Sequence, residues 1–296
     1  MKKVLLILLL LLFVSGCNIT NNNKNDSNDN NVLEPSTPST PDDSSVNDGI
    51  TTNKYGNFTI SSLTTDYEMV NNKLTISKGG EYTLSGVLNG SIIVSSSVDA
   101  SVTLYLNNLV ISTKDYHGIH YMSENGKLEI KAFENSTNSI TVNPNSSKVY
   151  SAIESENNIE IGGSGKLVLK GYQRHAVKGS NIEIKGNVIL EIEAVKDGLH
   201  GKQILISGGF TTINNCTDAI QAEVNNNNLK GTILIEEGNL TISNCKRAFR
   251  ANTSLTITPL SSSSVNINVS KVEEAIDTPK VNYNGGIFKI NGVDYK

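Results

Sequence analysis

Titratable side chains recur at two fixed positions of a phrase that repeats along this sequence. Each phrase has a small residue followed by Ile, Val, Leu or Phe, and the small residues are Gly118, Ala152, Ala176, Gly198, Ala219, Ala248 and Ala275. The residues just before them form a first column, which reads His117, Ser151, His175, Asp197, Asp218, Arg247 and Glu274. The residues two places after them form a second column, which reads His120, Glu154, Lys178, His200, Gln221, Arg250 and Asp277. Because these columns contain all 4 histidines of the chain, the sequence predicts a polar, titratable groove along one face.

Two carboxylates of the first column stand in successive repeats. Strand spacing would place the Asp197 and Asp218 carboxylates about 5 Å apart, where two unpaired carboxylates raise the pKa of one of them. A Ca²⁺ ion would relieve this conflict, since it takes carboxylate and carbonyl oxygens. We therefore predict a calcium site formed by Asp197 and Asp218, with Glu154 and Glu223 completing the shell. Two alternatives stay open, in which both Asp side chains cap turn amides or act as a catalytic acid and base.

Basic and amide side chains surround this acidic centre. Arginine pairs with carboxylates in a bidentate manner, which suits a sugar that carries a carboxyl group. The residues predicted to bind such a substrate are His175, Lys178, His200, Lys202, Gln221, Arg247 and Arg250. An ordinary solvated face of mixed charge is the alternative. A zinc site at His117 and His120 would need a third ligand that the spacing does not supply.

The elements that must position these columns are short strands. The phrase returns every 21–34 residues, and polar insertions account for the longer intervals. Between two phrases lie alternating runs such as Ile204/Ile206 and Thr211/Ile213, which are separated by Gly208-Gly209 and so predict strands joined by tight turns. Three strands per unit of about 21–29 residues, without the leucine-rich consensus, predict an all-β, right-handed parallel β-helix.

The N-terminal part of the chain predicts export. Residues 1–17 have two lysines before an apolar run that ends in Val14-Ser15-Gly16-Cys17, which matches a lipoprotein signal peptide with Cys17 as the lipidated residue. An ordinary secretory signal is the alternative. Residues 18–54 are rich in Asn, Ser, Thr and Pro and predict a disordered linker. We expect residues 55–296 to form one β-helix domain on the extracellular face of the cell membrane, anchored only through the lipid.

Composition narrows the range of partners. The net charge is −4, from 25 basic and 29 acidic residues, which predicts no attraction to nucleic acid or to anionic lipid. Aromatic residues make up 5% of the chain and Trp is absent, so stacking of neutral sugars on Trp is excluded. Nothing indicates an oligomer, and we expect a monomer.

Two cysteines other than Cys17 share a third position of the repeat. Cys216 and Cys245 each lie three residues before a small residue, where Val149, Val195 and Val272 stand in other repeats. The valines predict that this position faces the core, and strand spacing predicts a separation of about 4.8 Å. Both a disulfide and a pair of stacked buried thiols are compatible with this arrangement.

Several phrases together carry a family resemblance. EYTLSGVLNGSIIV, SAIESENNIEIGGSGKLVLKG, KDGLHGKQILISGGFTTI and TDAIQAE resemble a bacterial surface family of carbohydrate-binding β-helices that is distantly related to pectate lyases. The resemblance covers nearly all of residues 55–270. It implies a right-handed parallel β-helix, bound calcium with Asp197 and Asp218 among the ligands, and binding of plant cell-wall or other acidic polysaccharide without established catalysis.

Binding is therefore the function that we expect, and three alternatives remain. A calcium-dependent lyase of the pectate-lyase type would use Lys178 or Arg250 as its base. A glycosidase would use Asp197 and Asp218, whose predicted separation suits a retaining mechanism. A purely structural surface protein would leave the charged columns solvated.

Overall fold

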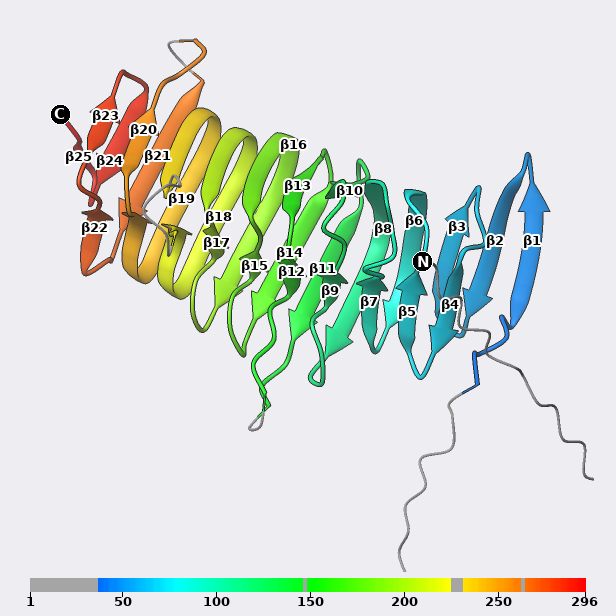
Figure 1. Ribbon diagram of the computed structural model, residues 1–296. Helices are drawn as coiled ribbons and strands as arrows, with labels where there is room; N and C mark the ends of the chain where they lie inside the picture. The colour runs from blue at the N-terminus through cyan, green and yellow to red at the C-terminus, as the bar shows by residue number, and fades with distance from the viewer. Residues whose placement is uncertain (1–36, 146–147, 225–230, 262–263) are drawn as a thin grey trace, which may run out of the picture. The chain divides into compact units, whose positions relative to one another are not determined.

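Alternating apolar and polar residues, broken by Gly and Asn, fold into short strands and tight bends in the computed structural model of this chain (Figure 1). The structure describes residues 37–145, 148–224, 231–261 and 264–296. These residues form 25 strands and contain no helix that could cross a membrane. Residues Ser36–Lys296 make up one compact unit with its own internal contacts.

Most strands lie in three parallel arrays that the chain visits in turn. The first array contains β5 (Lys73–Ile76), β7 (Ser91–Val94), β9 (Ile119–Tyr121), β12 (Ile153–Ser155), β15 (Val177–Lys178), β17 (Leu199–Gly201), the last parts of β18 (Gln203–Ala222) and β19 (Thr232–Ala251), and β22 (Glu274–Asp277). The second array contains the first parts of β6 (Gly80–Leu88), β8 (Val102–Thr113), β16 (Asn181–Ala194), β18 and β19, together with β10 (Lys127–Ala132), β13 (Asn158–Gly163), β20 (Ser254–Ile257) and β23 (Val281–Tyr283). The third array contains the next parts of the same long strands, together with β11 (Thr137–Val142), β14 (Lys166–Gly171), β21 (Val265–Ser270) and β24 (Ile287–Ile290). The predicted right-handed parallel β-helix is thereby confirmed.

Antiparallel strands close both ends of this helix. At the N-terminal end, β1 (Asp43–Asn47), β2 (Ile50–Tyr55) and β3 (Phe58–Ser62) pair in sequence, and β3 then pairs with β6. β4 (Tyr67–Val70) pairs antiparallel with β5, and β25 (Val293–Asp294) with β24. The predicted disordered linker is wrong over residues 43–54, because backbone pairing rather than apolar burial holds those polar residues in strands.

Equivalent side chains of successive rungs stack on one another in the core. Ile182 pairs with Ile204, and Ile204 pairs with Ile233. All three side chains are buried. Each rung can bury its apolar side chains only by packing against the rungs on either side of it.

One buried position of the third array holds an amide instead of an apolar group. The Asn138 Oδ1 accepts from the Leu109 N–H at 2.9 Å, and its Nδ2 donates to Ser136 Oγ at 2.8 Å and to the Lys166 carbonyl at 3.1 Å. These bonds satisfy a side chain that has no exposed surface, as a buried polar group requires.

The bend between the third and first arrays uses left-handed backbone. Asn215 and Asn244 both have a φ of 54°, and each directly precedes a cysteine. Asn visits this region more readily than most residues. The bends therefore superimpose from rung to rung, which brings the following residues of β18 and β19 into register.

Candidate functional site

The first array stacks both charged columns in the order that the sequence predicts. Backbone pairing aligns His120 with Glu154, Lys178 and His200, and continues through Gln221 to Arg250 and Asp277. We call the two columns together the charged strip. Its two columns differ in exposure, however.

The first column is buried over most of its length. His117, His175, Asp197 and Asp218 are all at most 8% exposed, whereas His120, Lys178, His200 and Arg250 in the second column are partly exposed. The prediction of an open groove lined by both columns is therefore wrong for the first column. The buried groups form pairs beneath the second column, and the first column meets solvent only at Arg247 and Glu274.

Glu154 is the centre of the N-terminal part of the strip. Its Oε1 accepts from Lys178 Nζ at 2.6 Å, and its Oε2 accepts from Ser151 Oγ at 2.8 Å. Burial raises the pKa of Glu154, but the hydrogen bonds from Lys178 and Ser151 outweigh burial and leave the pKa below its usual value. Both carboxylate oxygens are thus already satisfied by this chain's own side chains.

His117 is neutral beside this carboxylate. Its Nδ1 accepts a hydrogen bond from the Ser151 N–H at 3.1 Å, which requires a lone pair on that nitrogen. The same nitrogen lies 3.3 Å from Glu154 Oε2, so this contact is not a charged pair. Burial lowers the pKa of His117 to about 4, in agreement with the neutral form.

A second acidic residue, Asp197, is held by two histidines. Its Oδ2 lies 3.1 Å from His175 Nδ1 and 3.0 Å from His200 Nδ1. The two imidazole rings are 4.4 Å apart and inclined by 32°. Burial raises the pKa of Asp197, but its two histidine neighbours more than offset burial and hold the pKa well below its usual range.

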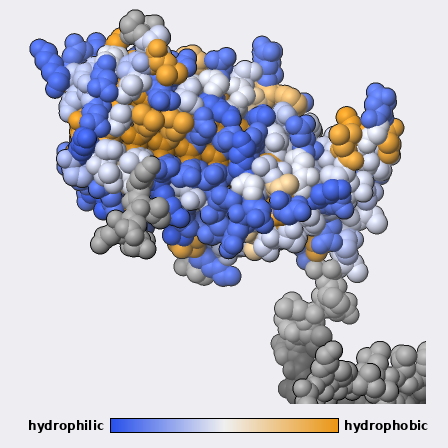
Figure 2. Space-filling model, turned by 45° about the horizontal axis from the view of Figure 1, so that its top comes forward, coloured by the Kyte–Doolittle hydropathy of each residue, from blue (hydrophilic) through white to orange (hydrophobic). Residues whose placement is uncertain are grey.

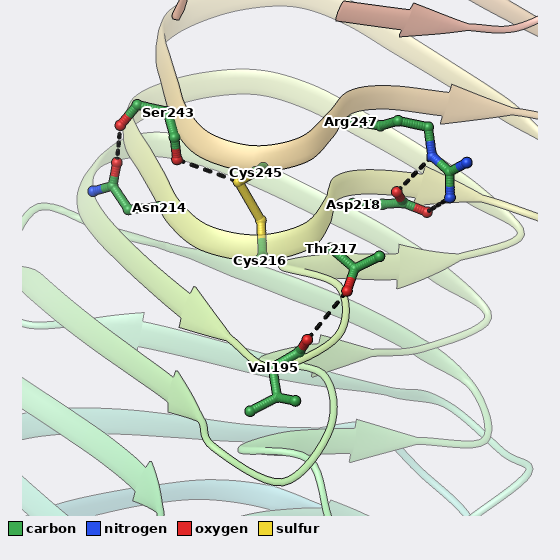
Figure 3. The surroundings of a disulfide bond; sticks show 8 residues. All are labelled: Val195, Asn214, Cys216, Thr217, Asp218, Ser243, Cys245 and Arg247. Carbon is green, nitrogen blue, oxygen red and sulfur yellow. Dashed lines mark hydrogen bonds and ion pairs between the residues drawn. A yellow bond between two sulfur atoms is a disulfide. The ribbon is translucent and has the colours of Figure 1, made fainter. Parts of the chain in front are cut away.

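The third acidic residue, Asp218, is paired with arginine. Arg247 Nε donates to Asp218 Oδ1 at 2.7 Å, and Arg247 Nη2 donates to Oδ2 at 3.0 Å, so that the pair is bidentate (Figure 3). The hydrogen bonds to Asp218 raise the pKa of Arg247. Arg250 lies further away, with its Nη1 at 3.5 Å from Asp218 and its Nε at 3.6 Å from Asp277. Arg250 therefore holds weaker contacts than Arg247.

Two predicted site residues lie beside these clusters. Gln221 Nε2 donates to Glu223 Oε2, which places this pair on the rung of Asp218. Lys202 is exposed and follows β17 at the bend toward the second array. The first array therefore brings together every predicted substrate-binding residue except Lys202, which lies at its edge.

The four predicted calcium ligands do not share a common set of free oxygens. Glu154, Asp197 and Asp218 are each paired with cationic or imidazole side chains, and Glu223 accepts from Gln221. A Ca²⁺ ion takes six to eight oxygen ligands and would have to displace a lysine, two histidines or a bidentate arginine. These residues, as the chain arranges them, do not fit calcium.

Sequence reasoning missed two tyrosines at the N-terminal end of the strip. Tyr116 Oη lies 2.7 Å from His120 Nδ1, and the Tyr116 ring lies 5.4 Å from that of Tyr150. Each tyrosine directly precedes a first-column residue. This repeated position was the available signal, and it shows that the strip becomes more aromatic toward its N-terminal end.

The two cysteines form a disulfide. Cys216 and Cys245 are register partners whose Cα atoms are 4.7 Å apart, and Figure 3 shows the bond between β18 and β19 near the Asp218–Arg247 pair. The prediction that this column faces the core is wrong for Val149 and Val195, which are 61% and 58% exposed. It holds for Cys245, which is 5% exposed, and for Cys216 and Val272, which pack against the core.

A hollow and an apolar patch lie outside the charged strip. Figure 2 shows apolar side chains gathered among hydrophilic ones on one part of the face in view. The exposed apolar residues include the register partners Ile189 and Phe210. Leu205 and Leu234 help to line a shallow hollow of about 310 Å³ on the second array. The hollow is also lined by Glu160, which forms ion pairs with Lys127 and Lys185, so it combines apolar contact area with a paired charge.

Comparisons with known proteins agree with this architecture. The chain is similar to a solved structure described as the polysaccharide lyase-like protein from C. thermocellum, a gadolinium derivative, with a TM-score of 0.61 and 22% identity over 78% of this chain and 92% of that chain. That likeness shows the fold. No curated protein matches the chain.

Two family models match the sequence. Residues 1–18 match the prokaryotic membrane lipoprotein lipid attachment site, which supports lipid anchoring; Cys17 itself lies outside the described residues. Residues 70–294 match the model of the carbohydrate-binding domain-containing proteins, which spans most of the β-helix. The chain is a member of the family of carbohydrate-binding domain-containing proteins.

Proposed function

We propose that this lipoprotein binds an acidic polysaccharide through the second column of the charged strip, on the extracellular face of the cell membrane. The observation that carries the proposal is that the Arg250 side chain is partly exposed and has only long contacts with acidic residues of the protein. Its side chain is 37% exposed, and its contacts with Asp218 and Asp277 are 3.5 and 3.6 Å long. A sugar carboxylate could therefore form shorter, bidentate bonds with this guanidinium than the protein does.

The repeat of the fold supports a polymeric ligand. Lys178, His200 and Arg250 are partly exposed and lie in one column along the helix axis, where neighbouring strands are about 4.8 Å apart. A polymer with a carboxylate on each sugar presents charges along a line in the same way. Several weak contacts in a row then add up to useful avidity.

The neighbouring charges support this role by holding the cations in place. Arg247 is fully engaged with buried Asp218, so we assign it a positioning role rather than direct contact with the polymer. Lys178 donates to Glu154, and this bond fixes the ammonium at the surface. Gln221, which lies between His200 and Arg250 in the column, and Lys202 at the edge of the array complete the predicted contact set.

The first experiment is a polymer screen with the chain from residue 18 onward, which contains every described residue. The protein is run through gels containing polygalacturonate or an uncharged glucan, with Ca²⁺ or with a chelator. We expect retardation by polygalacturonate only. Equal mobility in all gels would contradict the proposal, and retardation only with Ca²⁺ would show that calcium enters the complex through ligands other than the four paired carboxylates.

A matched pair of variants locates the contact. Arg250→Gln removes the least engaged cation of the strip, whereas Lys170→Gln removes a cation of the third array with the same 37% side-chain exposure. We expect the first variant to lose most of the retardation and the second to keep it. Equal losses would show that binding follows net charge rather than the strip.

The lyase alternative is tested on the same samples. β-Elimination creates an unsaturated product that absorbs in the ultraviolet, so absorbance is followed after mixing with polygalacturonate. Lys178, one of the two predicted bases, forms an ion pair with Glu154 at 2.6 Å, and the ammonium of such a pair has no lone pair with which to accept a proton. We expect no rise in absorbance, and a steady rise would make this protein an enzyme.

A further inference from the structure

Beyond polysaccharide binding, we propose that His175, Asp197 and His200 form a site for one divalent transition-metal ion, with Zn²⁺ as the best-suited ion. The three residues each bring one ligand atom within 4.8 Å of the other two. They come from three elements of the first array, namely the segment before β15, the segment before β17, and β17 itself. Asp197 and His200 lie on one rung and His175 on the rung before it, so the backbone of two successive rungs fixes their relative positions.

The distances are close to those that a tetrahedral ion needs. Zn²⁺ binds nitrogen and oxygen at about 2.0–2.2 Å, which places two ligand atoms roughly 3.3–3.5 Å apart. Asp197 Oδ2 lies 3.1 Å from His175 Nδ1 and 3.0 Å from His200 Nδ1. The two imidazole ligand atoms lie within 4.8 Å of each other, so binding a tetrahedral ion requires side-chain rotations that bring them closer together by up to about 1.3 Å.

An unpartnered nitrogen points to a missing ligand at this place. His175 is 1% exposed, and its Nδ1 has no hydrogen-bond partner among the described residues, although Asp197 Oδ2 is within 3.1 Å. The contact is short enough for a hydrogen bond but is not aligned for one. An ion bound to both His175 Nδ1 and Asp197 Oδ2 does not lie on the line that joins these two atoms. The bond from Nδ1 to the ion leaves that line by roughly 40° for metal–ligand bonds of this length. An ion can therefore bind Nδ1 where a direct hydrogen bond to Asp197 does not form.

The donor set selects the class of metal. Two imidazole nitrogens and one carboxylate oxygen suit zinc, copper or nickel, whereas calcium requires a shell of oxygens. The His200 side chain is 25% exposed, so water or another ligand can reach the fourth position. Lys178, the nearest cation in the second column, is directed toward Glu154 at 2.6 Å and does not occupy the site.

A second histidine pair in the same columns serves as an internal contrast. His117 and His120 also stand near a carboxylate, Glu154. There, however, His117 Nδ1 accepts from the Ser151 N–H and His120 Nδ1 is bonded to Tyr116 Oη. Those nitrogens have partners that are not proposed ligands, whereas the hydrogen bond of His200 Nδ1 goes to Asp197, which would itself bind the ion. We therefore assign the metal site to His175, Asp197 and His200 alone.

The test is a calorimetric titration of the untagged chain from residue 18 onward with ZnCl₂, in the presence of excess Ca²⁺. Arg174 is close enough to disfavour positive charge on His175, so we expect one ion per chain with a moderate Kd, on the order of 1–10 µM. Binding that Ca²⁺ abolishes, or no binding at about 100 µM zinc, would overturn the proposal.

Three variants assign the ligands. We expect Asp197→Asn and His200→Gln each to raise the zinc Kd at least tenfold, while His120→Gln leaves it unchanged. His200 is partly exposed, so its variant tests the site even if Asp197→Asn fails to fold, and circular dichroism without metal checks each fold. An unchanged Kd in His200→Gln, or an equal loss in His120→Gln, would show that zinc binds elsewhere.

Cobalt provides a second readout of coordination. Co²⁺ bound by two imidazoles and a carboxylate in a four-coordinate site gives strong visible absorption, whereas aqueous Co²⁺ is nearly colourless. We expect this absorption in the unaltered chain and in His120→Gln, and its loss in His200→Gln. A weak spectrum like that of aqueous Co²⁺ in the unaltered chain would contradict the tetrahedral assignment.

Discussion

Loss of the Arg247 side chain should destabilise the fold much more than loss of Arg250. Asp218 is 1% exposed, and Arg247 provides both of its short hydrogen bonds. Removing one partner of a fully buried ion pair costs about 3–5 kcal/mol, because the other charge is left uncompensated. Arg247 is 18% exposed, and Arg250 can move closer to Asp218, so we expect about 2–3 kcal/mol for Arg247→Ala.

Urea unfolding followed by far-ultraviolet circular dichroism measures this difference, since the chain has no Trp for fluorescence. Arg250→Ala is the control, with an expected change below about 1 kcal/mol, as for an exposed pair. The double variant Asp218→Asn/Arg247→Met removes both charges and should recover part of the loss. Equal destabilisation by Arg247→Ala and Arg250→Ala, or no recovery in the double variant, would refute a buried pair that depends on Arg247.

Three further predictions concern stability. Replacing both Cys216 and Cys245 by Ala should lower the unfolding free energy by about 3–4 kcal/mol, as expected for a closed loop of 29 residues, and a urea midpoint equal to that of the unaltered chain would contradict this. Burial lowers the pKa of His117 to about 4 in the folded chain, below its unfolded value of about 6.5. Between these two pH values the unfolded chain binds more protons than the folded chain. The unfolding free energy therefore falls as the pH drops from about 6.5 to 4, by about 3 kcal/mol at most. His117→Gln should flatten that part of the stability–pH curve, and an unchanged slope would refute the assignment. Asn138→Ala leaves the buried Leu109 N–H without its partner and should cost about 2–3 kcal/mol in urea unfolding, whereas a cost below about 0.5 kcal/mol would show that water replaces the amide.

The sequence predicted backbone register well because the repeat encodes it. A constant offset from each small residue placed His120, Glu154, Lys178 and His200 in one column, and the structure pairs them in that order. Parallel stacking allows little freedom once inward positions are fixed, since a slip by one residue would turn apolar side chains outward.

Exposure at the bends was harder to predict. Val195 and Cys216 share a column of small apolar residues, which suggested a position in the core, yet Val195 is 58% exposed. Cys245 stands in the same column and is 5% exposed, so residue type alone does not tell which positions of the column face the core. The strands at residues 43–54 were missed for a related reason, because their pairing depends on backbone bonds and not on an apolar pattern.

The charge partners of the carboxylates were also missed. Asp197 and Asp218 were considered as a repelling pair, but each is satisfied by partners on its own or a neighbouring rung. Column position fixes which residues are neighbours, whereas side-chain direction decides which of them pair. The orphaned His175 nitrogen could be found only in the structure.

The most direct test of polysaccharide binding is a calorimetric titration of oligogalacturonate into the unaltered chain, Arg250→Gln and Lys170→Gln. Binding through the charged strip predicts a Kd that rises about tenfold in Arg250→Gln, as for loss of a hydrogen bond to a charged group, and that stays unchanged in Lys170→Gln. The same Kd in all three proteins, or no heat of binding in the unaltered chain, would contradict the account.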